Sequence, residues 1–182
     1  IVKKIKNLED DADILTHDIT GYLVRTSAAE ISQENARAVT RMLRIASELE
    51  EISDAIFRLM QITQRKYKKN QILSDEATKN TLEFANKVIE LVDLYIEVLS
   101  GDVTDAQLKR AEKIEDETDK MRKQFNKKAM KRMGKVEGSV KTEMVNIDMN
   151  NQFELIANYG LNVVQTAFYI DNEDEVPEKY GD

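Results

Sequence analysis

The sequence contains no cysteine or tryptophan, one histidine and one proline among 182 residues. Without cysteine the chain can form neither disulfides nor thiolate metal sites, and one histidine excludes an imidazole-rich metal centre. A cysteine-free chain also fits a reducing compartment. One proline and six glycines leave few breaks, while 34% of the residues are charged. This composition favours helix, so we expect an all-α protein without β-structure.

Long hydrophobic runs and excess positive charge are missing as well. No apolar run reaches the roughly 18 residues that could span a bilayer, and no signal peptide pattern is present. The formal net charge of -7 argues against general affinity for nucleic acid. The length suits one core, or two small repeated halves that share one. Because the chain opens at Ile1 rather than Met, we expect it to be part of a longer polypeptide.

Apolar residues recur at spacings of three and four in five segments, the pattern of helices that face a core. We expect these helices over about 5–27, 32–68, 74–101, 104–134 and 140–169. Ser32 and Ser74 are good N-caps, and Thr104 with Gln107 has the spacing of a capping box. Residues 171–182 form an acidic, proline-containing tail that we expect to be frayed.

One acidic six-residue motif, the duplicated phrase, occurs twice, as LEDDAD at 8–13 and as IEDETD at 114–119. A shift of 106 residues carries the apolar stripe of the first expected helix onto that of the fourth. A shift of 104 carries 49–54 of the second helix onto 153–158 of the fifth. We interpret the phrase as part of a duplicated two-helix unit.

The acids of this unit stand four residues apart, which places each pair on one helical face. The first unit carries Glu9, Asp13, Glu50 and Asp54, and the second carries Glu115, Asp119, Glu154 and Asn158. The midpoint of the first set falls near 31–32 and that of the second near 136–137, inside the expected turns. An antiparallel hairpin would therefore bring each set to one height. The sequence predicts two sites, one per half.

Converging carboxylates repel one another, so a cation should neutralise them. Carboxylate oxygens without histidine or cysteine suit hard or borderline ions such as iron, manganese, zinc, magnesium or calcium. The alternative is that these acids are solvated helix faces, offset by neighbouring Lys and Arg. A single Glu-x-x-x-Asp is weak evidence among 34 acids, whereas its repetition in register favours metal sites. His17 lies four residues after Asp13 on the same helical face. The corresponding residue of the second unit is Lys123, so we expect a surface or hydrogen-bonding role for His17.

The segment ELEEISD at 48–54 resembles the L-E-R-I-G-D phrase of the PhoU family, and Glu9/Asp13 and Glu115/Asp119 match its other motif. The resemblance implies phosphate-uptake regulators built from two three-helix repeats that carry multinuclear metal clusters. It covers nearly the whole chain and is greatest for the domain that follows the membrane part of bacterial sodium/phosphate cotransporters. Glu51 and Ser53 depart from the usual Arg and Gly. Asn158 replaces the last Asp, so the second site should bind more weakly.

By this resemblance the chain divides into a first PhoU-like half (1–70, two helices), a second half (71–170, three helices) and a tail (171–182). The first half lacks a counterpart of the helix at 75–99, which we expect upstream of Ile1. The resemblance implies a non-enzymatic cytosolic regulator at the inner face of the membrane, attached to a transporter module on its N-terminal side. Inorganic phosphate and a second copy are candidate partners. The alternatives are a metal-free structural or adaptor bundle and a di-iron enzyme, which the missing Glu-x-x-His steps disfavour.

In an up-and-down bundle, the start of the first helix and the ends of the second and fourth lie at the same end. Basic residues are concentrated at that end. They are Lys3, Lys4, Lys6, Arg65, Lys66, Lys68, Lys69, Lys127, Lys128, Lys131, Arg132 and Lys135. Complementation of helix dipoles explains basic side chains at C-termini but not Lys3 and Lys4. We expect this end to face an anionic membrane surface.

Overall fold

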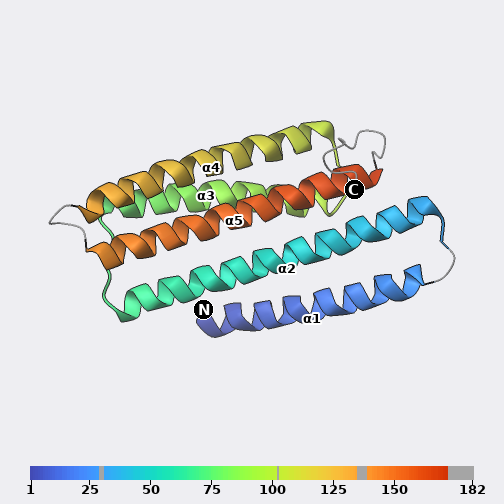
Figure 1. Ribbon diagram of the computed structural model, residues 1–182, viewed down its shortest axis with the longest axis horizontal. Helices are drawn as coiled ribbons and strands as arrows, with labels where there is room; N and C mark the ends of the chain where they lie inside the picture. Colours follow the sequence, from blue (N-terminus) through green and yellow to red (C-terminus); the bar gives the residue numbers. More distant parts are fainter. Residues whose placement is uncertain (29–30, 102, 135–138, 172–182) are drawn as a thin grey trace.

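The computed structural model describes residues 1–28, 31–101, 103–134 and 139–171, and these form five α-helices without a strand (Figure 1). The helices are α1 (Val2–Ser27), α2 (Gln33–Lys68), α3 (Asp75–Val98), α4 (Asp105–Met133) and α5 (Val140–Asp171). The all-α prediction is therefore confirmed. The expected frayed tail beyond residue 171 lies outside the described residues. In the part of the chain that the structure describes, no helix has the length and hydropathy to cross a bilayer.

Local side-chain chemistry starts three of the helices where the sequence predicts. The Ser32 hydroxyl accepts a hydrogen bond from the Asn35 amide at 3.2 Å, and Ser74 caps α3 in the same way. Thr104 and Gln107 form the predicted capping box at the start of α4. Each cap satisfies an amide that the first helical turn would leave unpaired. The turn expected after Gly134 includes 135–138, which lie outside the described residues.

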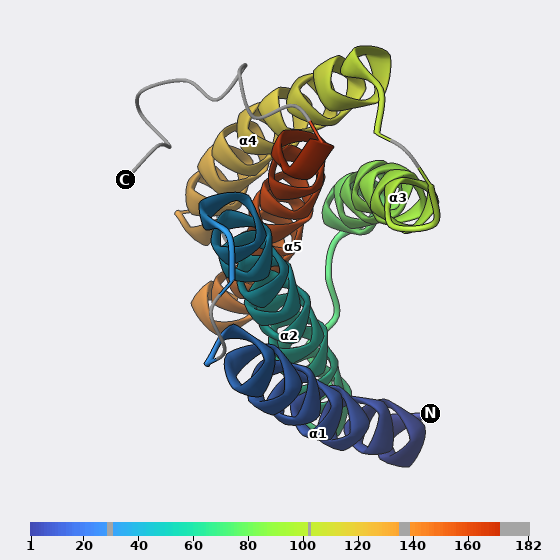
Figure 2. The ribbon, with the colours of Figure 1, turned by 90° about the vertical axis from the view of Figure 1, so that its right-hand side faces the viewer.

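Helix α5 is the centre of the bundle and contacts α2, α3 and α4, while α1 contacts α2 alone (Figure 2). Helices consecutive in the chain run antiparallel (Figure 1). The core lies mainly in the second half, where the Phe84 ring packs edge-on against Phe125 and at a tilt against Phe153, with ring centroids 6.0 and 5.4 Å apart. Leu91 and Val163 belong to the same core cluster and are at most 1% exposed. The α3–α5 group therefore holds most of the buried apolar surface.

The α1/α2 pair, by contrast, leaves its apolar face open. Ile114 and Phe125 of α4 are each 4% exposed, whereas their counterparts in α1, Leu8 and Ile19, are 56% and 45% exposed. Helix α3 covers α4, and no described element covers α1 in this way. An apolar groove of about 550 Å³ results, lined by Asp18, Ile19, Tyr22, Leu23, Met42, Ile45, Ala46, Leu49 and Leu99. That a helix upstream of α1 occupies this side stays a prediction.

The expectation of one common basic end is wrong for the first of its three groups. Lys6 stands over the Phe57 ring of α2, with its ammonium 5.6 Å from the ring centroid. Helix α2 continues from there to Lys68, about 16 Å further along its axis. The cause is helix length, because α1 has 26 residues and α2 has 36. The last residues of α2 and α4 lie at the same end of the bundle, with the start of α5 between them (Figure 1). Lys135 lies outside the described residues.

Candidate metal centre

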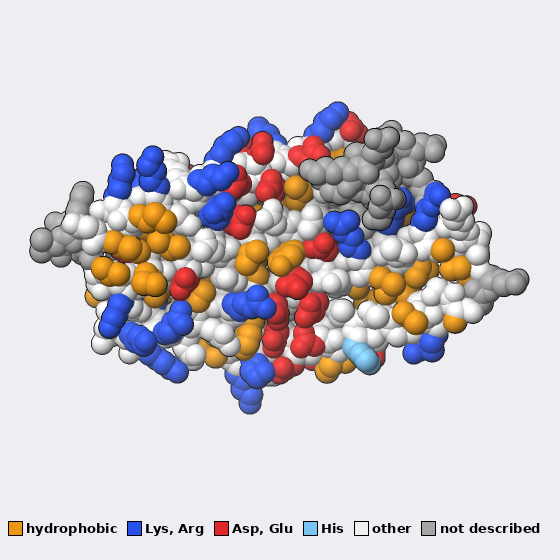
Figure 3. Space-filling model, in the orientation of Figure 1, with side chains coloured by type: hydrophobic (Ala, Val, Ile, Leu, Met, Phe, Trp, Pro, Cys, Tyr) orange, Lys and Arg blue, Asp and Glu red, His pale blue; other side chains and the backbone are white. Residues whose placement is uncertain are grey.

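Three of the four predicted acids of the first hairpin meet between α1 and α2. Asp13 of α1 and Glu50 and Asp54 of α2 each place a carboxylate oxygen within 4.8 Å of the other two. Asp13 is exposed and the two α2 acids are half-buried. Figure 3 shows acidic side chains gathered across both helices at mid-length. The antiparallel hairpin brings the pairs to one height, as their spacing predicts.

Two acids of this hairpin, Glu50 and Glu9, have a pKa raised above the usual range. Burial, and then the neighbouring Asp54 carboxylate, raise the pKa of Glu50 above its usual range. The pKa of Glu9 is raised by burial first, then by Asp13, with a smaller contribution from Asp54 across the hairpin. Glu9 thus belongs to the same electrostatic cluster, although it is not one of the three converging acids. A cluster of this kind resists complete ionisation unless a cation is present.

Among the described residues, one basic side chain, Arg58, forms an ion pair with this acidic group. The Arg58 guanidinium donates to the Asp54 carboxylate at 2.5 Å, one helical turn along α2. Both side chains are partly exposed, at 51% for Arg58 and 26% for Asp54. Arg58 forms no ion pair with Asp13 or Glu50 among the described residues. His17, further along α1, is exposed and is not part of the acidic group.

The second hairpin brings its predicted residues together differently. Asp119 accepts hydrogen bonds from Arg122 at 3.0 Å and from Lys123 at 2.5 Å. These contacts lower the pKa of Asp119, the Lys123 hydrogen bond contributing most. Arg122 Nε also lies 3.7 Å from Glu154 Oε1 in α5. The carboxylate that could bind a metal therefore already has two basic partners of its own chain.

The other three members of this second set, Glu115 of α4 and Glu154 and Asn158 of α5, are half-buried. Burial, followed by the Asp119 carboxylate, raises the pKa of Glu115. Asn158 donates from Nδ2 to Glu154 Oε1 at 2.9 Å, so it contacts the set through a donor rather than an acceptor. Over the described ranges, the second hairpin forms no group of three converging acid ligands. That any of the eight predicted residues binds a metal stays a prediction.

The sequence itself contains the difference in basic residues between the two hairpins. Arg122 and Lys123 correspond, 106 residues earlier, to Thr16 and His17. A basic residue three or four positions after an acid reaches it on the same helical face. The second site therefore has its own cations built into α4, whereas in the first, over the described residues, Arg58 is the basic side chain that forms an ion pair with one of the predicted acids.

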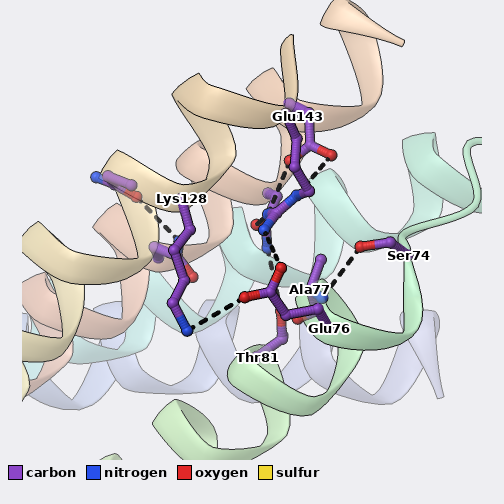
Figure 4. Close-up of polar contacts among 10 residues, drawn as sticks. Ser74, Glu76, Ala77, Thr81, Lys128 and Glu143 are labelled. Atoms are coloured by element: carbon purple, nitrogen blue, oxygen red, sulfur yellow. Dashed lines mark hydrogen bonds and ion pairs between the residues drawn. The ribbon is translucent and has the colours of Figure 1, made fainter. Parts of the chain in front are cut away.

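A second polar cluster, which periodicity did not predict, ties α3, α4 and α5 together (Figure 4). Arg132 donates to both oxygens of Glu143 at 3.0 and 2.9 Å, and Glu143 is only 2% exposed. Arg132 also reaches Asn146 at 3.2 Å, and Asn146 donates to the Thr81 hydroxyl at 3.1 Å. Glu76 of α3 completes the cluster with ion pairs to Arg132 and Lys128. Its buried members are internally paired, which indicates a structural role.

Comparison with known proteins adds two findings. Residues 1–63 match the PhoU domain family, a range that contains α1 with Asp13 and the part of α2 with Glu50 and Asp54. The chain is also similar to YjbB of Salmonella typhimurium, whose name describes it as a candidate inorganic phosphate export protein. Over 113 aligned residues the two are 29% identical, and the match covers 61% of this chain and 21% of YjbB. The aligned part is thus about a fifth of that relative.

Proposed function

We propose that this chain is a PhoU-like regulatory domain, without catalytic activity of its own, that binds a metal ion and acts in phosphate transport or its control. The carrying observation is the convergence of Asp13, Glu50 and Asp54 from two helices within 4.8 Å. The match of 1–63 to the PhoU domain, and the phosphate export named for YjbB, support the phosphate connection. Attachment to a membrane module such as a sodium/phosphate cotransporter is part of the proposal.

The donor set fits a hard or borderline cation. Asp13, Glu50 and Asp54 offer carboxylate oxygens only, which suit iron, manganese, zinc or magnesium. Burial first, and then the Asp54 carboxylate, raise the pKa of Glu50, and a bound cation would offset both penalties on its charged form. Glu9 would add negative charge at the edge of the site. The set at Glu115, Asp119, Glu154 and Asn158 would bind more weakly, because Arg122 and Lys123 already neutralise Asp119.

Regulation would act through the weakly held α1 helix. Asp13 is the member of the acidic group that lies on α1, while Glu50 and Asp54 lie on α2. Because α1 contacts no other described helix, a cation shared by these residues would decide how firmly α1 is held. The apolar groove beside Ile19 and Leu49 would open or close with it. Metal occupancy could thereby control a transporter module that contacts this side.

The metal content of purified protein tests the proposal. The chain is prepared without chelator or metal-affinity resin, incubated with iron, manganese, zinc or magnesium, and measured by plasma mass spectrometry. The variant Asp13→Asn, Glu50→Gln, Asp54→Asn should lose about one ion per chain. The matched control Asp75→Asn, Glu83→Gln, Asp93→Asn removes equal charge from exposed positions of α3 and should keep it. Absence of metal from the parent with every ion, or full retention by the first variant, contradicts the proposal.

A separate measurement tests the phosphate connection. The same acid variant is introduced into the intact protein in cells, and phosphate uptake and efflux are followed at low and high external phosphate. We expect flux that no longer responds to phosphate supply, while the α3 control behaves as the parent. Unchanged flux and regulation would leave a metal-free adaptor bundle as the better description. The exposed apolar face of α1 and α2 is the observation that favours this second candidate.

A further inference from the structure

One end of the bundle, which we call the tip, has a charge opposite to that of the whole chain. It comprises the last nine residues of α2 and α4, the first nine of α3 and α5, and the connection at 69–74. Its basic side chains are Arg65, Lys66, Lys68, Lys69, Lys79, Lys127, Lys128, Lys131, Arg132 and Lys141, and its acids are Asp75, Glu76, Glu83, Glu143 and Asp148. In a chain of formal charge -7, this is a strong segregation of positive charge.

Most of the acids at the tip already have partners. Glu76 pairs with Lys128 and Arg132, and the buried Glu143 is held by Arg132. Asp148 lies 3.5 Å from Arg65. Six exposed lysines of the tip form no ion pair with a described residue, namely Lys68, Lys69, Lys79, Lys127, Lys131 and Lys141. The tip therefore presents positive charge to its surroundings rather than to the protein.

Large apolar side chains are exposed among these lysines. Ile72 is 85% exposed, Tyr67 71% and Met130 60%, and Val140 and Met144 are more than half exposed. Figure 3 shows an apolar patch at this end with basic side chains on both sides of it. The helix dipole accounts for basic residues at the ends of α2 and α4. It accounts neither for the apolar side chains nor for Lys141, which lies in the first turn of α5.

Exposed apolar side chains within a ring of lysines suit an anionic lipid surface. The ammonium groups attract phosphate headgroups, and the apolar groups enter the boundary between headgroups and acyl chains. A soluble acidic protein would satisfy the lysines but would leave Ile72 and Met130 without an apolar environment. We propose that the tip is a contact surface for anionic phospholipid membranes. This surface is separate from the acidic group, since Asp54 lies about 21 Å before Lys68 along α2.

Vesicle co-sedimentation of the 182-residue chain tests the proposal. Vesicles of phosphatidylcholine alone are compared with vesicles that contain about 30% phosphatidylglycerol, at low and high salt. The tip variant changes Lys68, Lys69, Lys131 and Lys141 to Gln. The matched control changes Lys3, Lys4, Lys113 and Lys120 to Gln, which alters net charge equally away from the tip. A third variant, Ile72→Ser with Met130→Ser, tests the apolar contribution against Ile89→Ser with Ile96→Ser on α3.

We expect binding to the anionic vesicles only, weakened by salt. The lysine tip variant should bind at least about tenfold more weakly, since each lysine near an anionic surface contributes measurably. The Ile72/Met130 variant should also bind more weakly, and both controls should bind as the parent does. Absence of binding at low salt, or equal loss in the lysine control, overturns the proposal. Binding to soluble polyglutamate as tight as to vesicles, unaffected by Ile72→Ser with Met130→Ser, would instead show a site for acidic polypeptides and also overturns it.

Discussion

Arg122 donates a hydrogen bond at 3.0 Å to Asp119, three residues earlier in α4, whereas the equivalent residue of α1, Thr16, has no charge to offer Asp13. The duplicated hairpins thus differ in what neutralises their acids. In the second hairpin the chain's own Arg122 and Lys123 contact Asp119. In the first, Arg58 is the described basic side chain that forms an ion pair with one of the converging acids, Asp54.

If Arg122 and Lys123 are what weakens the second site, their replacement should strengthen it. The change Arg122→Thr with Lys123→His installs the residues of the first hairpin in the second. We expect bound metal to rise from about one ion per chain toward two, because Asp119, Glu115 and Glu154 lose their internal cations. Titration calorimetry with manganese measures the stoichiometry. The control Arg110→Thr with Lys113→His changes the same residue types at exposed α4 positions and should leave it unchanged. No second ion would mean that Asn158 alone disables the site.

Protonation of Glu50 should stabilise the metal-free protein. Burial and Asp54 raise the pKa of Glu50 in the folded state, so the folded protein holds this proton to higher pH than the unfolded chain does. The stabilising contribution is complete below the unfolded pKa and is lost as pH rises through the folded pKa. Glu50→Gln should therefore raise the melting temperature at pH 7 with chelator present and change it little near pH 4. Thermal unfolding by circular dichroism follows both proteins, and a variant less stable at pH 7 without metal contradicts the prediction.

Removing Arg132 should destabilise the protein far more than removing an arginine from the surface. Arg132→Met leaves the carboxylate of Glu143 buried without its partner, and loss of one member of a buried pair costs about 3–5 kcal/mol. Arg65→Met breaks only the half-exposed pair with Asp148 and should cost less than about 1 kcal/mol. Urea denaturation compares the two variants. Adding Glu143→Gln to Arg132→Met should restore part of the loss, and equal losses in the single variants would show that the pair is not effectively buried.

The helices and the first acidic group follow from the sequence because they depend on local rules. Ser32, Ser74 and Thr104 fix helix starts by satisfying nearby amides. Asp13 and Asp54 lie at similar distances along the chain from the turn of the hairpin, which places them at the same level on adjacent helices. These features require only periodicity and an antiparallel hairpin. The duplicated phrase then indicates which acids belong together.

What sequence reasoning missed depends on packing between distant segments. The position of Lys6 beside Phe57 follows from the unequal lengths of α1 and α2. A constant shift between sequence repeats does not reveal such a difference in helix length. The Arg132–Glu143 pair joins residues with no counterpart in the first half, so the repeat gave no signal for it. The effect of Arg122 on the second site was accessible, since a basic residue three positions after Asp119 lies on the same face.

The strongest test of the link between metal and conformation is hydrogen exchange of α1 compared with α4. Among the described helices α1 contacts only α2, and its apolar residues Leu8 and Ile19 are about half exposed, whereas α4 packs against both α3 and α5. In metal-free protein the amides of α1 should therefore exchange faster than those of α4, because separating α1 from α2 exposes little new apolar surface. Mass spectrometry of peptides from 2–27 and 105–133 measures both helices in one sample.

Metal should then slow exchange selectively in α1. A cation shared by Asp13, Glu50 and Asp54 must be released before α1 can separate, and at a concentration 100-fold above its Kd this costs about 2.7 kcal/mol. Exchange in α1 should slow roughly a hundredfold, since every 1.4 kcal/mol is a factor of ten. Exchange in α4 should change little, and the variant Asp13→Asn, Glu50→Gln, Asp54→Asn should show no effect of metal in α1. Equal slowing of both helices would mean that metal stabilises the whole bundle, and that α1 is not the element through which the site acts.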